Sequence, residues 1–194
     1  MLAGGRGLRM GGKDKAFIQL AGKPLIEHVI ARLAPQTGAI VINANREPSR
    51  LDGLSVPVIA DSVPDFAGPL AGVLAGLEWA EAKNLEVLLT VPVDVPFLPA
   101  DLVKRLREAR RGNDVACASS GGRMHHVIAL WPVSMAPRLR HALVIENLHK
   151  VEAWLSRHRV GIAEWPASPY DPFFNINAPQ DLEQAEEIAR GFFS

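Results

Sequence analysis

The amino-acid sequence predicts a three-layer α/β/α domain with a mostly parallel β-sheet. Short apolar runs typical of buried strands alternate along the chain with segments whose apolar residues recur at helical spacing. Strands that alternate with helices in this way form a parallel sheet covered by helices on both faces. The chain has 194 residues, of which 48% are hydrophobic, and it can therefore bury a substantial core. Glycine and proline are spread along the chain and form no linker, so we expect residues 1–194 to be one domain.

The first half of the chain begins with an unusual feature. Only Met1 and Leu2 precede a glycine-rich segment, although a phosphate-binding loop normally follows a buried strand. Either this strand is nearly absent or the sequence begins short of its natural start. Buried strands are predicted at residues 39–45 and 56–61. A helix is predicted after Pro24 from the apolar positions Leu25, Ile26, Val29, Ile30 and Leu33.

The second half continues the alternation of helices and strands. Residues 68–77 open a helix in which Gly72 and Gly76 predict a close approach to the sheet or to a ligand. Residues 86–91 are the most strand-like run of the chain, and Gly121 and Gly122 predict a turn between two later strands. The other expected elements are helices at 99–111, 136–143 and 150–158, strands at 114–118, 127–131 and 160–165, an extended piece at 173–177, and a last helix that begins at Pro179 with Asp181 in its first turn.

The first fifteen residues combine glycines with cations in a pattern typical of a polyphosphate-binding loop. Glycines let backbone N–H groups approach an anion closely, and the cations supply the charge that holds it. Met10 stands where the dinucleotide-binding pattern needs its third glycine, and Asp14 stands where the Walker pattern needs Ser or Thr, so neither familiar loop fits. The alternative is a flexible, solvated basic terminus. The glycines are Gly4, Gly5, Gly7, Gly11 and Gly12, and the cations are Arg6, Arg9, Lys13 and Lys15.

Polar side chains lie at or just after the carboxyl ends of the predicted strands, which is where ligands bind in open α/β sheets. They are Asn43, Asn45, Asp61 and Asp94. Asp94 follows the most hydrophobic strand, and Pro92 and Pro96 stiffen the backbone around it. A carboxylate held rigidly beside a phosphate site is a suitable oxygen ligand for Mg²⁺. The ordinary alternative is a carboxylate that caps a turn.

Four asparagine and aspartate positions have two interpretations. Asn43 and Asp61 could read a nucleoside, because an amide donates and accepts hydrogen bonds and a carboxylate accepts them. They could equally form Asx turns at strand ends. Asn175 and Asn177 precede the last helix, where capping is the ordinary use of asparagine.

The adjacent residues His125 and His126 have no third partner at metal-ligand spacing. No Ser or Cys forms a recognisable nucleophile–base pair in the sequence. Histidines near turns are usually solvated, so we assign these two no catalytic role.

Charge and cysteine content exclude several classes of protein. The 21 basic and 21 acidic residues cancel, so the net charge gives no indication of nucleic-acid or membrane binding. The single cysteine, Cys117, cannot form an internal disulfide and is typical of a reducing cytoplasm. No apolar run approaches the length needed to span a bilayer, and the N-terminus lacks the apolar stretch of a secretory signal. We therefore expect a cytoplasmic protein that binds neither nucleic acid nor membrane.

These motifs together resemble one family. The segment Leu2-Ala-Gly-Gly-x-x-x-Arg-Met-Gly-Gly-x-Asp-Lys15 resembles the signature of nucleotidyltransferases with a Rossmann-like fold of the nucleotide-diphospho-sugar transferase type. In combination with narrower motifs, and over nearly the whole chain, it resembles the molybdenum cofactor guanylyltransferases (molybdopterin-guanine dinucleotide synthases). The narrower motifs are Gly22-Lys-Pro-Leu25, Asn43-Ala-Asn45, Asp61-Ser62, Gly68-Pro-Leu-Ala-Gly72, Pro92-Val-Asp-Val-Pro-Phe-Leu98 and Asn175-Ile-Asn177-x-Pro179-x-Asp-Leu182.

The resemblance implies transfer of GMP from GTP to the phosphate of Mo-molybdopterin, with release of pyrophosphate and formation of the guanine dinucleotide form of the cofactor. It implies that Asp94 binds Mg²⁺, and that Asn175 and Asn177 lie on the pterin side. It assigns the reaction itself to Arg9, Lys15 and Asp94. The residues implied to bind the nucleotide are Leu2, Ala3, Gly4, Gly5, Lys15, Asn43, Asp61 and Asp94.

The alternatives are other nucleotidyltransferases of the same fold and a protein without activity. A cytidylyltransferase or a sugar-phosphate nucleotidyltransferase would use a similar loop, although residues 68–72 and 175–177 argue against both. A non-catalytic nucleotide or cofactor carrier would bind GTP without releasing pyrophosphate. The resemblance also implies molybdoenzymes or their chaperones as partners, and it suggests a monomer.

Overall fold

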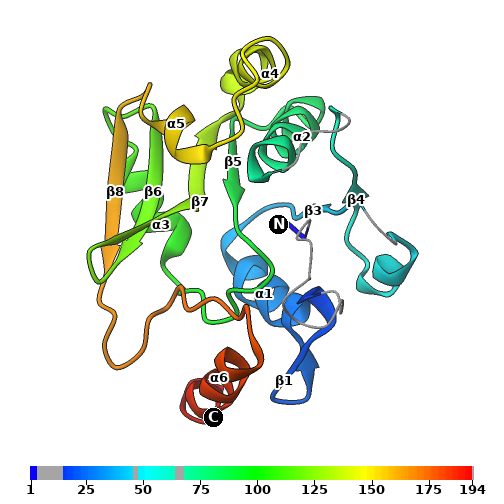
Figure 1. The fold of residues 1–194 in the computed structure, drawn as a ribbon, viewed down its shortest axis with the longest axis vertical. Helices are drawn as coiled ribbons and strands as arrows, with labels where there is room; N and C mark the ends of the chain where they lie inside the picture. The colour runs from blue at the N-terminus through cyan, green and yellow to red at the C-terminus, as the bar shows by residue number, and fades with distance from the viewer. Residues whose placement is uncertain (4–14, 46–47, 64–67, 194) are drawn as a thin grey trace.

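A computed structural model describes residues 1–3, 15–45, 48–63 and 68–193 of the protein (Figure 1). The α-helices are α1 (Leu25–Leu33), α2 (Pro69–Ala82), α3 (Leu102–Ala109), α4 (Ala136–Val144), α5 (Val151–Leu155) and α6 (Pro179–Phe192). The strands are β1 (Gln19–Leu20), β2 (Lys23–Pro24), β3 (Ile42–Asn43), β4 (Val58–Ile59), β5 (Val87–Thr90), β6 (Val115–Ser120), β7 (Arg123–Pro132) and β8 (Val160–Trp165). The 3₁₀ helices are η2 (Lys15–Phe17), η3 (Ala34–Gln36), η4 (Pro48–Leu54) and η5 (Val133–Met135).

The central sheet has the order β4, β3, Leu2, β5, β7, β6, β8. The pair β3–β4 and the pair β6–β8 are parallel, and Leu2 forms parallel bridges to Asn43 of β3 and to Pro92 just after β5. Strand β7 pairs antiparallel with both β5 and β6, so it runs opposite to the other described strands of this sheet. The prediction of a mostly parallel sheet is confirmed. Outside the sheet, β1 and β2 form a separate antiparallel pair.

The first segment of the chain is very short, yet it lies at the centre of the sheet. The amide of Leu2 donates to the carbonyl of Val91 at 2.8 Å, and the amide of Ala3 donates to the carbonyl of Asn43 at 2.9 Å. The amide of Asn43 in turn donates to the carbonyl of Met1 at 2.8 Å. Backbone hydrogen bonds on both edges therefore hold residues 1–3 between β3 and the end of β5.

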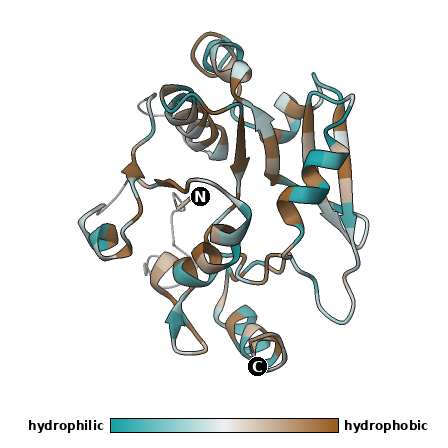
Figure 2. Ribbon diagram, turned by 180° about the vertical axis from the view of Figure 1, so that it is seen from behind, coloured by the Kyte–Doolittle hydropathy of each residue, from teal (hydrophilic) through white to brown (hydrophobic). Residues whose placement is uncertain are grey.

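Helices cover both faces of this sheet. Val115 and Cys117 of β6 pack in a core with residues of α2, α4 and α5, whereas Ala116 and Ala118 pack in a second core with residues of α1 and α3. Successive side chains of a strand point to opposite faces, so the two cores are the two sides of one sheet. Figure 2 shows hydrophobic colouring along β5, which agrees with the prediction of a buried strand at residues 86–91. The predicted three-layer arrangement is confirmed.

The observed elements are shorter than several of the predicted ones. Strand β4 covers only two residues of the predicted 56–61, and Pro57, which has no N–H, contributes to the pairing only through its carbonyl, which accepts from Ile42 at 2.9 Å. The turn at Gly121 and Gly122 is confirmed, with φ of 54° and 76°. That turn makes β6 and β7 a hairpin, which explains why β7 is the reversed strand.

The segment before α6 brings the C-terminal part of the chain to the centre of the molecule. The amide of Ile176 donates to the backbone carbonyl of Asp94 at 3.0 Å. The carboxylate of Asp181 accepts the amides of Asn177 at 2.7 Å and Ala178 at 2.8 Å, which caps the start of α6. The capping is therefore done by Asp181, and the Asn177 side chain is available for other contacts.

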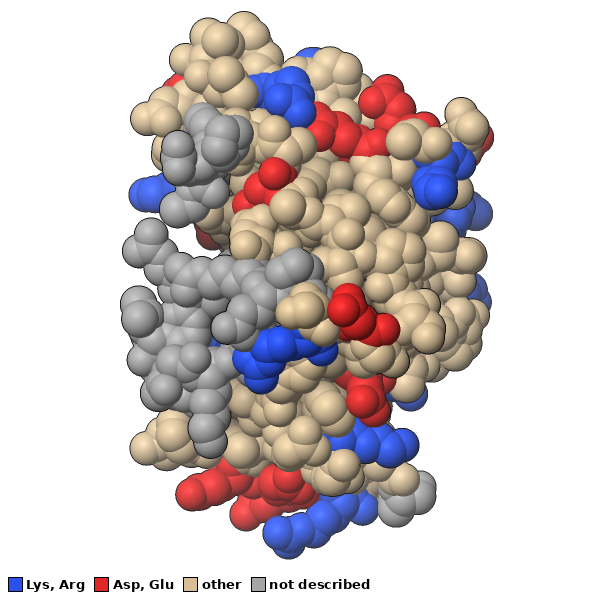
Figure 3. All heavy atoms as spheres, turned by 90° about the vertical axis from the view of Figure 1, so that its right-hand side faces the viewer, with Lys and Arg blue, Asp and Glu red and all other residues tan. Residues whose placement is uncertain are grey.

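Acidic and basic side chains are interspersed on the face of the molecule seen from the right-hand side of Figure 1, as Figure 3 shows. Within the described part of the chain, no helix is both long enough and apolar enough to cross a membrane.

Candidate active site

Three side chains from distant parts of the chain meet beside the carboxyl end of β5. The Nζ of Lys15, in η2, donates to Oδ2 of Asp94 at 2.9 Å. The same Nζ donates to Oδ1 of Asn177, from the segment before α6. Lys15 is separated from these two partners by 79 and 162 positions in the sequence. The fold therefore joins the end of the glycine-rich stretch, the centre of the sheet and the C-terminal segment at one carboxylate.

The carboxylate of Asp94 has one unused oxygen. Its Oδ1 is buried and has no hydrogen-bond partner among the described residues. A buried carboxylate oxygen without a partner is costly, and a cation is the ligand that would compensate it. The described residues contain no cluster of three or more His, Cys, Asp or Glu that could enclose a metal by themselves. Asp94 therefore suits a hard divalent cation whose other ligands come from water and from phosphate oxygens, as is common for Mg²⁺.

A second polar cluster lies at the carboxyl ends of β3 and β4. The Nδ2 atoms of Asn43 and Asn45 donate to the two carboxylate oxygens of Asp61, at 2.8 Å and 2.6 Å. The backbone amide of Asp61 donates to Oδ1 of Asn45 at 2.8 Å. The two predicted site residues Asn43 and Asp61 are thus in direct contact. Asn45, to which the sequence assigned no function, fixes the orientation of the Asp61 carboxylate.

Helix α2 touches this cluster through a glycine. A Cβ atom placed on Gly72 would lie 2.4 Å from Oδ1 of Asn43 and 2.9 Å from Cδ2 of Leu2. At Gly76, one turn further along, the nearest atom to an added Cβ is Cδ2 of Leu88 at 2.9 Å, the end of a flexible side chain. The predicted close approach of this helix is therefore to the sheet, and at Gly72 it leaves the room that the Asn43 side chain occupies.

Residues 1–3 connect the two clusters. Ala3 is bonded to the backbone of Asn43, and the carbonyl of Leu2 accepts the amide of Val93 at 3.2 Å, one residue before Asp94. Most of the predicted site residues therefore lie together along one edge of the sheet, the one formed by the carboxyl ends of the parallel strands. They are Leu2, Ala3, Lys15, Asn43, Asp61, Asp94 and Asn177. The predicted residues Gly4, Gly5 and Arg9 lie outside the described residues.

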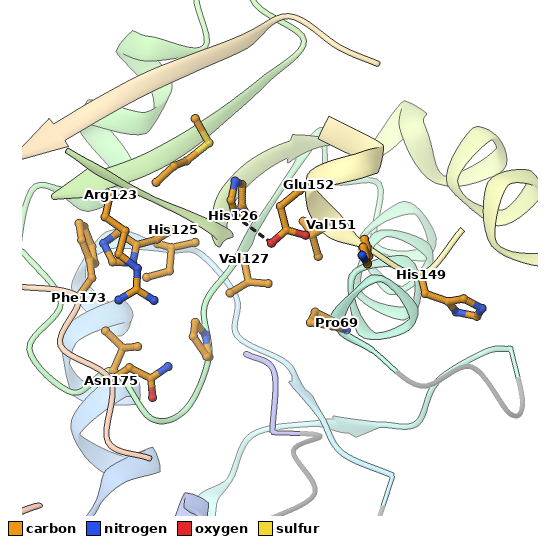
Figure 4. Close-up of a pocket in the computed structure, with 15 residues that line it drawn as sticks. Pro69, Arg123, His125, His126, Val127, His149, Val151, Glu152, Phe173 and Asn175 are labelled. Carbon is orange, nitrogen blue, oxygen red and sulfur yellow. Dashed lines mark ion pairs between the residues drawn. The ribbon is translucent and has the colours of Figure 1, made fainter. Parts of the chain in front are cut away.

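A cavity of about 370 Å³ opens next to this edge (Figure 4). Pro92 and Val95, which flank Asp94, contribute to its wall. Asn175 lines the cavity, whereas the side chain of Asn177 is bonded to Lys15. The two asparagines predicted for the pterin side therefore lie in different parts of the site. Figure 4 shows Arg123, His125, Phe173 and Asn175 grouped on one side of the cavity and Pro69, His149, Val151 and Glu152 on the other.

Polar residues that the sequence left unassigned form a network on the first of these sides. The Oγ of Ser120 donates to Oδ1 of Asp171 at 2.7 Å and lies 2.7 Å from Nε2 of His125. The same Oδ1 accepts the amide of Phe173 at 2.8 Å, and the rings of His125 and Phe173 are 4.8 Å apart. Burial is the main cause that lowers the pKa of His125 from its ordinary value of 6.5.

This network contains Ser, His and Asp, but its hydrogen bonds do not have the order that nucleophilic catalysis requires. In a catalytic triad the histidine takes the serine proton and the aspartate orients the histidine. Here the serine donates its single proton to the aspartate, so no base is placed to activate Ser120. The histidines are not solvated turn residues as expected, because both lie within β7 and His126 Nδ1 pairs with Glu152 Oε1 of α5 at 3.3 Å. No local signal revealed the network, since Asp171 is 51 positions from Ser120.

Comparison with known proteins connects this arrangement to nucleotidyltransferases. Residues 1–161 match the family model described as MobA-like NTP transferase domain. A protein of Rhodopseudomonas palustris (strain BisB5) named molybdenum cofactor guanylyltransferase is 50% identical over 193 residues, which cover 97% of this chain and 92% of the relative. A protein of the same name from Mesorhizobium japonicum (strain LMG 29417 / CECT 9101 / MAFF 303099) is 42% identical over 200 residues, covering 100% of this chain and 96% of the relative.

A solved structure has the same overall fold. The crystal structure of molybdopterin-guanine dinucleotide biosynthesis protein A from Archaeoglobus fulgidus has a TM-score of 0.73 and 28% identity, covering 98% of this chain and 97% of that one. The similarity extends over both chains almost completely, so the sheet order and the helical layers described above are those of a known fold.

The contact between Lys15 and Asp94 predicts an energetic coupling. Lys15→Met removes the counter-charge of a largely buried carboxylate and should lower the free energy of unfolding by about 1–3 kcal/mol. In a background that carries Asp94→Asn, the same change should cost less, because no charge is left unpaired. Urea titrations of the four proteins measure the coupling. If Lys15→Met costs the same in both backgrounds, the ion pair does not contribute to stability.

Proposed function

The chain belongs to the family of MobA-like NTP transferase domains, and we propose that it transfers GMP from GTP to the terminal phosphate of Mo-molybdopterin. The products are the guanine dinucleotide form of the cofactor and pyrophosphate. The observation that carries the proposal is the meeting of Lys15, Asp94 and Asn177 beside the Asn43–Asp61 pair, at the strand ends where an α/β sheet binds its ligands.

The nucleotide side of the site is proposed as follows. The glycine-rich stretch that begins at Leu2 and Ala3 carries the phosphates, with Gly4 and Gly5 supplying backbone N–H groups. Asn43 and Asp61 face the nucleoside, and the rigid contact between them keeps the amide and the carboxylate in fixed positions. A preformed pattern of donors and acceptors discriminates between bases, because the wrong base leaves buried polar groups unpaired.

We propose that basic side chains and a metal ion together offset the charge on the phosphates. Lys15 and Arg9 stabilise the departing pyrophosphate, as a point charge and as a planar fork respectively. Asp94 holds Mg²⁺ through its carboxylate, whose Oδ1 is otherwise without a partner among the described residues. When bound, Mg²⁺ neutralises negative charge on the phosphate oxygens and orients them.

The cavity beside Asp94 is the proposed place of the acceptor. A phosphate oxygen of Mo-molybdopterin attacks the α-phosphorus of GTP; one oxygen–phosphorus bond forms, the bond from the α-phosphorus to the bridging oxygen breaks, and pyrophosphate leaves with that oxygen. Positioning and charge neutralisation suffice for such a transfer, so no protein nucleophile is needed. Asn175, Arg123 and Lys150 line the cavity and can bind a polar, anionic acceptor.

We also propose that residues 1–194 form one domain and that the protein acts as a cytoplasmic monomer. Molybdoenzymes or their chaperones are the partners proposed to receive the product.

Pyrophosphate release tests the proposed reaction directly. Purified protein with Mg²⁺, molybdopterin loaded with molybdenum and GTP should release one pyrophosphate per dinucleotide formed, and CTP in place of GTP should release little. Omitting Mg²⁺ should stop the release. Binding of GTP without any release of pyrophosphate would favour a carrier, and faster release from CTP would favour a cytidylyltransferase.

Asp94→Asn should lower kcat at saturating GTP by at least about a hundredfold, because the site loses the carboxylate that holds the metal. The variant should stay folded, since asparagine has nearly the same shape. Asp52→Asn, at an exposed position in η4, is the matched control and should retain activity. Normal turnover in Asp94→Asn would contradict the assignment of the metal to this residue.

Gly72→Ala should raise the KM for GTP by about tenfold, comparable to the loss of one hydrogen bond, because the new methyl group displaces the Asn43 side chain. Gly76→Ala on the same helix meets only the flexible end of Leu88 and should leave this KM unchanged. Thermal unfolding followed by circular dichroism verifies that both variants fold. Equal KM values for the two variants would show that Asn43 does not contact the nucleotide.

A further inference from the structure

The Asp171–Ser120–His125 network fixes the tautomer of one histidine. Ser120 has one hydroxyl proton, and it donates that proton to Oδ1 of Asp171. The 2.7 Å contact between the Ser120 oxygen and Nε2 of His125 must therefore carry the proton of the histidine. Neutral His125 is held as the Nε2–H form, and its Nδ1 carries a lone pair.

Nδ1 of His125 is the ring nitrogen that this network leaves without a partner among the described residues. The buried polar atoms without a partner in the described part of the chain do not include this nitrogen, so its surface is not fully covered by protein. It is consequently in reach of a molecule from outside, and His125 is part of the wall of the cavity beside Asp94. Figure 4 shows the ring on the side of the cavity where Arg123, Phe173 and Asn175 lie.

Two direct contacts and one supporting hydrogen bond fix the position of the ring. Ser120 holds Nε2, the ring of Phe173 packs at 4.8 Å, and the amide of Phe173 is bonded to the same carboxylate oxygen that accepts from Ser120. A side chain restrained in this way loses little entropy when it makes one more hydrogen bond. A partly buried ring also stays neutral near pH 7, because burial opposes its protonation.

We propose that His125 determines specificity for the acceptor: its Nδ1 accepts a hydrogen bond from a ring N–H or amino group of the heterocycle, and Ser120 and Asp171 are the positioning residues that keep Nδ1 unprotonated. The proposal rests on the function proposed above. The cations Arg123 and Lys150 in the same cavity suit the phosphate of the acceptor, whereas His125 supplies a neutral acceptor atom. A heterocycle with N–H donors and a phosphate fits both groups.

The proposal predicts how acceptor binding depends on pH. The charged and titratable groups around the ring are Asp171 and Glu164, which favour its protonation, and Arg123 and His126, which oppose it. Burial is the largest influence and places the pKa of His125 below 6.5. As the pH is lowered through that pKa, Nδ1 gains a proton and can no longer accept a hydrogen bond. The KM for the acceptor should therefore rise at low pH, while the KM for GTP should not follow the same curve.

Variants of the network separate recognition from structural support. His125→Ala should raise the KM for molybdopterin about five- to tenfold, as expected for one lost hydrogen bond. His125→Asn offers an amide oxygen close to the place of Nδ1, so it should restore most of the affinity and abolish the pH dependence. Ser120→Ala removes the group that holds the proton on Nε2 of His125, so both tautomers become possible. It should raise the KM for molybdopterin about two- to fivefold. Ser156→Ala is the control, because this hydroxyl is bonded to the carbonyl of Ala153 at 3.0 Å, away from Asp171 and His125.

A binding measurement tests the proposal without turnover. Protein labelled with ¹⁵N at histidine should show His125 with an unprotonated Nδ1, a mixture of tautomers in Ser120→Ala, and a shift of the Nδ1 signal when molybdopterin is added in the absence of GTP. An Nδ1 signal that molybdopterin does not change would overturn the proposal, even if pyrophosphate release is normal. Equal effects of Ser156→Ala and Ser120→Ala on the KM would also overturn it.

The two proposals can fail independently. If the wild-type protein releases no pyrophosphate from GTP and molybdopterin, the proposed function fails, and the ¹⁵N titration still decides whether His125 binds the heterocycle. If pyrophosphate is released normally but His125→Ala keeps the wild-type KM and pH profile, only the assignment of His125 is wrong. Should His125→Ala fail to fold, Ser120→Ala and His125→Asn carry the same test.

Discussion

The contact between Lys15 and Asp94 is the interaction on which the site depends. A carboxylate that is almost entirely buried needs a positive charge nearby, and Lys15 at 2.9 Å supplies one. The same ammonium group binds Asn177, so a single cation ties the N-terminal stretch and the segment before α6 to the end of β5. Because Oδ1 of Asp94 has no partner among the described residues, the balance of charge also leaves a place for a second cation. The arrangement suits a site whose ligands are themselves polyanions.

The sheet gives this contact its rigidity. Residues 1–3 are hydrogen-bonded on both edges, to β3 and to the segment after β5, which fixes the distance between the Asn43–Asp61 pair and Asp94. Helix α2 packs closely against the strands at Gly72, where the missing side chain leaves room for Asn43. Small residues and backbone hydrogen bonds hold the polar groups here, and a preorganised site of this kind needs little rearrangement when a ligand binds.

The cavity beside Asp94 is built from parts that are remote in the sequence. Strand β7 contributes His125, α5 contributes Glu152, and the segment before α6 contributes Phe173 and Asn175. The reversed direction of β7 matters, since the hairpin sets His125 opposite Ala118 of β6 and Arg123 opposite Ser120. The Ser120 hydroxyl then lies within hydrogen-bond distance of both His125 and Asp171. The polar groups at the strand ends and the cavity thus share the turn around Asp94, so the two sites that we propose for the nucleotide and the acceptor adjoin one carboxylate.

Much of this protein could be predicted from its sequence. Periodicity and glycine–proline punctuation predicted the three-layer fold, and position after a strand predicted that Asn43, Asp61 and Asp94 share an edge, because the carboxyl ends of parallel strands lie together. Local patterns could not show that Asn45 orients Asp61, that Asp181 caps α6 in place of Asn177, or that Ser120 contacts both Asp171 and His125. Each of those contacts joins side chains brought together by the tertiary fold. A hydrogen bond depends on distance and direction in space, and only the packed sheet determines these.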